Sequence, residues 1–127
     1  MFYIADTHAW VYYLFDKLPE KANEIFTSAE KGKSIIIVPS ISLAECIHLI
    51  ETRKIALSYE ELFSKFEKST NFIIAPLDFD ILKIVPDIRL SELHDRVIVV
   101  TAKIIQAKVI TEDDEIIKSG IVKTIWK

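Results

Sequence analysis

The sequence has 127 residues, 50% of them hydrophobic and 10% aromatic, which is enough for one domain over residues 1–127 to bury a core without disulfides. Its single cysteine, Cys46, excludes an intramolecular disulfide and fits an intracellular protein. No apolar run approaches the roughly 18 residues of a membrane span, so we expect a cytoplasmic protein with no membrane partner. The formal charge of −3 gives no general affinity for nucleic acid, although acids at a catalytic site and bases around its rim would sum to the same value.

The first predicted strand begins at Phe2 and ends on Asp6, where an apolar run gives way to a carboxylate, a hydroxyl and an imidazole. In an open α/β sheet, ligands bind at the carboxyl ends of the strands, so Asp6 is a candidate for chemistry. The alternative is that Asp6 only caps the helix predicted over residues 9–14. The aromatic side chains of that helix predict a buried core or an oligomer surface.

Helices and strands alternate through the middle of the chain. Apolar residues three and four apart predict a helix over 18–31, and a β-branched run predicts a strand over 34–38. Two capping-box sequences, one from Ser42 to Glu45 and one from Ser58 to Glu61, predict a helix over about 42–55 and another that begins at residue 58.

The second half of the chain continues the alternation. A strand is predicted over 71–75, and a short helix follows it and stops before Pro86. The next segment is rich in β-branched residues, but its length favours a helix over about 94–106. Two further strands, over 108–111 and 121–125, complete a pattern that predicts a three-layer α/β/α domain with a parallel sheet.

Acidic residues recur where a predicted strand gives way to a helix or where a helix begins. Because these points lie at one edge of a parallel sheet, we expect the carboxylates to face the same edge. Taken singly, each is as well explained by helix capping or by the helix dipole, worth about 0.3–1 kcal/mol. Glu45 is harder to explain in this way, because it interrupts an apolar helix and a buried carboxylate is costly unless paired. The four acids are Asp6, Glu45, Asp95 and Asp113.

Four converging carboxylates repel each other, and a hard divalent cation removes that repulsion. An all-oxygen site suits Mg²⁺ or Mn²⁺, which bind phosphate oxygens and activate water, so the pattern favours hydrolysis of a phosphodiester. No histidine or cysteine pair has the spacing of a zinc site. The three histidines are expected to be structural, with His94, beside Asp95, the best exception. Arg96 either pairs with Asp95 or contacts a substrate phosphate.

Four stretches of the sequence resemble, in order, the motifs of the PIN-domain ribonucleases, in particular the VapC-type toxins of toxin–antitoxin pairs. Residues 4–10 resemble the opening strand that ends in Asp-Thr, and residues 38–45 the second motif, with an acid early in a helix. Residues 94–102 are similar to the third motif, an Asp that opens an apolar helix, and residues 109–114 to the fourth, a strand ending in Thr-x-Asp. The resemblance spans the whole chain.

This resemblance implies a five-stranded parallel sheet in the order 3-2-1-4-5, with the first strand at the centre. It also implies an endoribonuclease that depends on Mg²⁺ or Mn²⁺, with RNA as substrate, an antitoxin protein as partner and a homodimer or higher homo-oligomer as the assembly. The residues that it assigns to the site are Asp6, Glu45 and Asp95 as metal ligands, Asp113 as the acid that holds a metal-coordinated water, and Thr111 as the residue that orients its neighbours. Asp114 stands beside Asp113, so which of the two faces the site stays open, and Arg96 is the candidate substrate contact.

Two other functions fit a domain of this size. A phospho-acceptor receiver domain has a similar sheet, but it needs an adjacent acidic pair near the first strand, which this sequence lacks. A degenerate PIN-like module would keep the fold for binding alone, and the presence of all four acids argues against it.

Overall fold

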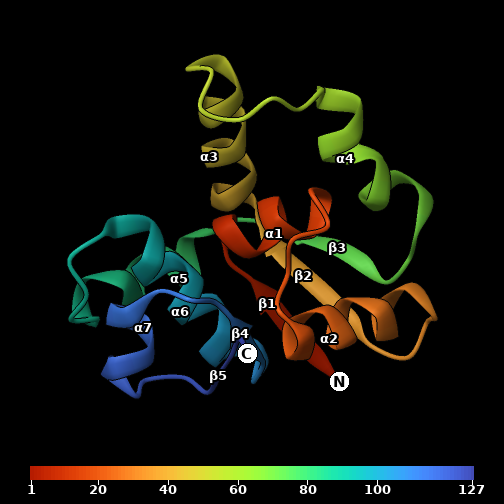
Figure 1. Cartoon of the computed structure of the whole chain (residues 1–127). Helices are drawn as coiled ribbons and strands as arrows, with labels where there is room; N and C mark the ends of the chain where they lie inside the picture. The colour runs from red at the N-terminus through yellow and green to blue at the C-terminus, as the bar shows by residue number, and fades with distance from the viewer.

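The computed structural model describes residues 1–127 as a five-stranded, all-parallel sheet with helices on both faces (Figure 1). The strand order β3-β2-β1-β4-β5 places β1 at the centre, as the resemblance implied. The strands are β1 (Phe2–Ala5), β2 (Ile35–Pro39), β3 (Phe72–Ala75), β4 (Lys108–Ile110) and β5 (Thr124–Ile125). The helices are α1 (Thr7–Leu14), α2 (Glu20–Glu30), α3 (Ser40–Glu51), α4 (Tyr59–Lys68), α5 (Phe79–Ile84), α6 (Leu93–Ile105) and α7 (Asp114–Ser119), and the 3-10 helix η1 (Val85–Asp87) follows α5.

Alternation along the central strand β1 separates the two faces of the sheet. Tyr3 and Ala5 lie in a core with side chains of α1, α2, α3 and α4. Ile4 points to the opposite face and packs with Ile98 and Ala102 of α6. Figure 1 shows the same division, with α5, α6 and α7 grouped on the left of the view. Because both faces are covered, the strands read in the sequence as continuous apolar runs.

Aromatic side chains fill the core between α1, α2, α4 and the sheet. Trp10 is fully buried, and the centroid of its ring lies 4.8 Å from that of Phe66 and 5.3 Å from that of Tyr13. Tyr13 stacks on Phe26 at 4.4 Å. The sequence prediction that the aromatic residues of the first helix form core is therefore confirmed at Trp10, whereas Phe15 at the end of α1 is 36% exposed.

The first of the two predicted capping boxes is wrong. Helix α3 begins before Ser42, and Ser42 is a fully buried residue whose hydroxyl has no partner. The physical reason is Pro39, which ends β2 and is also the N-cap residue of α3. Since α3 starts at Ser40, directly after this strand residue, Ser42 lies inside the first turn of the helix and cannot occupy the N-cap position. The second capping box is confirmed, since Ser58 and Glu61 exchange side-chain and backbone bonds at the start of α4.

The segment after residue 93 forms α6, which confirms that its β-branched residues belong to a helix. The fifth strand is shorter than predicted, because only Thr124 and Ile125 pair with β4. Helix α7 lies in a stretch for which no helix was predicted, and the side chain of Asp113 caps it by accepting a bond from the amide of Ile116. None of the helices has the length and apolar character needed to cross a membrane.

Candidate active site

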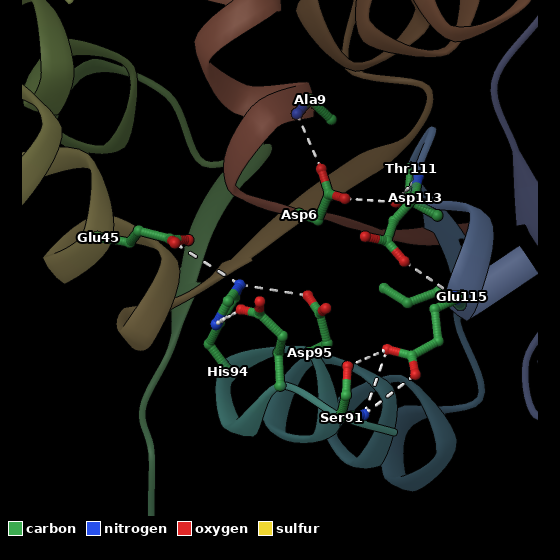
Figure 2. Close-up of polar contacts among 11 residues, drawn as sticks. Asp6, Ala9, Glu45, Ser91, His94, Asp95, Thr111, Asp113 and Glu115 are labelled. Atoms are coloured by element: carbon green, nitrogen blue, oxygen red, sulfur yellow. Dashed lines mark hydrogen bonds and ion pairs between the residues drawn. The ribbon is translucent and has the colours of Figure 1, made fainter. Parts of the chain in front are cut away.

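A polar cavity of about 280 Å³ lies at the carboxyl edge of the sheet. Ile98 is the one hydrophobic residue among the eleven that line it. All four acids predicted from the sequence are in this lining, and Figure 2 shows them reaching the cavity from different elements. The full lining is Asp6, Thr7, His8, Glu45, Ser91, Glu92, His94, Asp95, Ile98, Asp113 and Glu115.

Asp6 follows the central strand and is only 6% exposed. Its Oδ1 accepts a 2.8 Å hydrogen bond from the amide of Ala9, which caps α1, and its Oδ2 accepts a bond from the hydroxyl of Thr111. Burial raises the pKa of Asp6, and these two hydrogen bonds oppose the rise. The sequence left open whether Asp6 caps a helix or lies at a site for chemistry. In the structure Asp6 caps α1 and also lines the cavity.

Thr111 connects two of the acids. It is fully buried at the end of β4, where its hydroxyl donates to Asp6 and accepts a 3.0 Å bond from the amide of Asp113. Asp113 caps α7 and lines the cavity, whereas Asp114 is exposed in the first turn of that helix and is absent from the lining. Helix capping therefore settles which of the two neighbouring carboxylates faces the cavity.

Asp95 lies in the first turn of α6 and is 7% exposed. Its pKa is raised to about 6, and burial is the largest cause. The nearby charge of His94 opposes the rise in pKa, and the negative charges of Asp113 and Asp6 contribute to it. A carboxylate with a pKa raised by burial and by other carboxylates is one that a cation would stabilise in its charged form.

Glu45 and His94 face each other across the cavity from α3 and α6 (Figure 2). The Nε2 atom of His94 lies 3.6 Å from Glu45 Oε2 and 3.4 Å from Asp95 Oδ1, and its Nδ1 atom lies 3.3 Å from Glu92 Oε2. The second oxygen of Glu45, Oε1, is buried and has no hydrogen-bond partner. Ligand atoms of Glu92, His94 and Asp95 all lie within 4.8 Å of one another. His94, which the sequence singled out among the histidines because it adjoins Asp95, thus lies in the site.

Arg96 does not pair with Asp95 and is not part of the cavity lining. Its side chain is half-buried, and its Nε atom has no partner. The pairing with Asp95 that the sequence allowed is therefore wrong. Arg96 follows Asp95 directly on α6, and the side chains of consecutive helical residues point in different directions. Contact with a substrate phosphate stays a prediction.

Sequence reasoning missed Ser91, Glu92 and Glu115. Glu115 accepts bonds from the amide of Ser91 at 3.2 Å and from its hydroxyl at 2.8 Å, so it joins α7 to the loop before α6 (Figure 2). The acidic run after β4 was visible in the sequence, but no local pattern distinguished Glu115 from its neighbours. Its role depends on a contact between segments 24 residues apart.

The donor set of the cavity fits a hard divalent cation. Carboxylate oxygens of Asp6, Glu45, Asp95 and Asp113 line one polar space, and oxygen ligands of this kind suit Mg²⁺ and Mn²⁺. The buried, unpartnered Oε1 of Glu45 would gain a partner from a cation, and a cation would offset the burial and the charge repulsion that together raise the pKa of Asp95.

An α/β/α domain with an acidic cavity at the carboxyl edge of a parallel sheet in the order 3-2-1-4-5 defines the class of this protein. The sequence profile of the PIN domain matches residues 3–120. The chain therefore belongs to the PIN domain family. No curated protein sequence is significantly similar to it.

Several solved structures share the fold. The VapBC2 complex of Rickettsia felis bound to a DNA fragment from its promoter contains a chain with a TM-score of 0.73 and 18% identity, with 100% of each chain covered. FitAcB from Neisseria gonorrhoeae gives a TM-score of 0.63 at 18% identity over 97% of this chain and 96% of the other. A toxin–antitoxin complex from Klebsiella pneumoniae gives 0.63 at 18% identity over 94% and 93%. At this level of identity the matches establish the fold.

Proposed function

We propose that this protein is an endoribonuclease that depends on Mg²⁺ or Mn²⁺ and hydrolyses phosphodiester bonds in RNA. The observation that carries the proposal is the convergence of Asp6, Glu45, Asp95 and Asp113 on one polar cavity at the carboxyl edge of the sheet. Membership of the PIN domain family supports it further. With a family match over nearly the whole chain, a receiver domain is no longer a competing interpretation.

Asp6, Glu45 and Asp95 would hold the cation, with Asp113 beside them. When bound, the cation would polarise the scissile phosphate and make water a better nucleophile at neutral pH. The chain's own contribution is a fixed arrangement of acids, because Thr111 holds Asp6 and the amide of Asp113 in place from a fully buried position. A carboxylate that is held in place by bonds from a rigid strand loses little freedom on binding, which is the basis of preorganisation.

We further propose that residues 1–127 act as one nuclease domain, that the protein is the toxin of a toxin–antitoxin pair, and that it assembles as a homodimer or higher homo-oligomer in the cytoplasm. Support for an antitoxin comes from the solved structures with the same fold, two of which are described as a VapBC2 complex and as a toxin–antitoxin complex. The gene immediately upstream tests this part directly, since an antitoxin gene would encode a short DNA-binding protein with a disordered tail.

The catalytic part is tested with the purified chain and a single-stranded RNA in Mn²⁺. We expect the double variant Asp6→Asn and Asp95→Asn to lose cleavage while its circular dichroism spectrum stays that of the wild type. Asp114→Asn is the matched control, because it removes an exposed carboxylate next to Asp113 that does not line the cavity. Unchanged cleavage in the folded double variant would refute the assignment of the site.

A further inference from the structure

His94 has a different partner on each side of its ring. Its Nε2 atom faces Asp95 Oδ1 at 3.4 Å and Glu45 Oε2 at 3.6 Å (Figure 2). Its Nδ1 atom faces Glu92 Oε2 at 3.3 Å. Asp95 and Glu45 are two of the proposed cation ligands, whereas Glu92 lies on the outer side of the ring and is an exposed residue. The imidazole therefore stands between an outer carboxylate and the cation site.

The outer carboxylate, that of Glu92, favours one of the two neutral forms of the His94 imidazole. A carboxylate beside Nδ1 favours a proton on that nitrogen, and in the neutral imidazole Nε2 then carries the lone pair. A carboxylate beside one ring nitrogen and a metal ion on the other is the usual arrangement of histidine ligands in proteins, because the carboxylate fixes the tautomer and the orientation of the ring. In this protein Nε2 is the nitrogen that faces the carboxylates of Asp95 and Glu45, so it points into the proposed cation site.

The geometry points to His94 as a nitrogen ligand of the divalent cation, oriented by Glu92 and acting together with Asp95 and Glu45. This inference rests on the proposed function, and it specifies which cation the site prefers. The Nε2 atom of His94 lies 3.4 Å from Asp95 Oδ1 and 3.6 Å from Glu45 Oε2, and two ligands of one small ion lie at most about 4 Å apart, so these atoms are already close enough to share one cation.

A nitrogen ligand changes the selectivity of the site. Mg²⁺ prefers oxygen ligands and keeps much of its water, whereas transition-metal ions bind imidazole nitrogen more strongly. A cavity with carboxylates alone would accept Mg²⁺ and Mn²⁺ with little distinction. The addition of His94 makes Mn²⁺ the preferred cation.

The test uses the full chain, purified without a histidine tag and kept in a nitrogen-free buffer. Pulsed electron paramagnetic resonance of the Mn²⁺-loaded protein detects a directly bound ¹⁴N nucleus, and calorimetry measures the affinities for Mn²⁺ and Mg²⁺. We expect His94→Gln to abolish the nitrogen signal and to weaken Mn²⁺ binding by at least about tenfold, with Mg²⁺ binding little changed. His8→Gln is the matched control, since His8 lines the same cavity but does not belong to the group formed by Glu92, His94 and Asp95.

Three results would overturn the inference, and they have different meanings for the proposed function. Mn²⁺ binding without a nitrogen signal in the wild type would reject His94 as a ligand and leave the carboxylate site intact. A nitrogen signal that disappears in His8→Gln and persists in His94→Gln would identify His8, and not His94, as the nitrogen ligand. Failure of the wild type to bind either cation would reject the metal site itself, and the inference with it.

Discussion

Replacement of Asp95 by asparagine should stabilise the metal-free protein at alkaline pH. Burial and nearby carboxylates raise the pKa of Asp95 from 3.8 to about 6, so the folded chain retains this proton to a higher pH than the unfolded chain. The free energy of unfolding therefore falls as the pH rises from about 3.8 to about 6, and it stays low above that range. At about 1.4 kcal/mol per pKa unit, the loss at pH 8 is at most roughly 3 kcal/mol.

Urea denaturation in EDTA measures this effect. Below pH 4 the two proteins should be almost equally stable, because the carboxyl of Asp95 is then protonated and resembles the amide of asparagine. At pH 8 the Asp95→Asn variant should be the more stable by up to roughly 3 kcal/mol. Equal stability at pH 8, or a more stable wild type, would show that Asp95 is not held in a repulsive, desolvated site.

Three further substitutions or reactions test the structure around the site. Thr111→Val keeps the shape of the side chain but removes the hydrogen bond to Asp6 and the one from the amide of Asp113. It should therefore lower the free energy of unfolding by roughly 2–4 kcal/mol and reduce RNA cleavage. Full activity of this variant would contradict the positioning role of Thr111. Trp10→Ala should cost about 3–5 kcal/mol in urea denaturation, since the ring is fully buried, and a loss below 1 kcal/mol would contradict the aromatic core. Burial raises the pKa of the Cys46 thiol to about 12, so a thiol reagent at pH 8 should modify it only as fast as the chain unfolds, and rapid modification of the folded protein would show an accessible thiol.

Most of the scaffold could be predicted from the sequence, because it depends on local patterns. Short apolar runs bounded by glycine, proline or polar residues marked the strands, and the apolar spacing marked the helices. The predicted capping box at Ser42 failed for a local reason, since Pro39 already starts the helix without it. The strand order depends on contacts between distant strands, which no local pattern specifies, and its prediction came from the resemblance to the PIN domain.

Three of the four acids were visible because Asp6 and Asp113 follow strands and Asp95 lies in the first turn of a helix, and parallel strands bring these points together. Glu45 lies beyond the first turn of α3, and it was visible because it interrupts an apolar helix. Contacts between distant segments could not be predicted. His94 contacts Glu45 only because α6 approaches α3, and Glu115 bonds to Ser91 only because α7 packs beside the loop before α6. The choice between Asp113 and its neighbour depended on a helix that the sequence did not indicate.

A calorimetric titration of Mn²⁺ into the purified chain tests the central claim most directly, since it measures the cation site without reference to any substrate. The wild type and the Asp114→Asn control should bind Mn²⁺ alike and should unfold at a higher temperature in its presence, because binding stabilises the folded state by mass action. The folded double variant Asp6→Asn and Asp95→Asn should lose both effects. Binding of equal strength in that double variant, or the absence of binding in the wild type, would contradict a carboxylate-held cation at the carboxyl edge of the sheet.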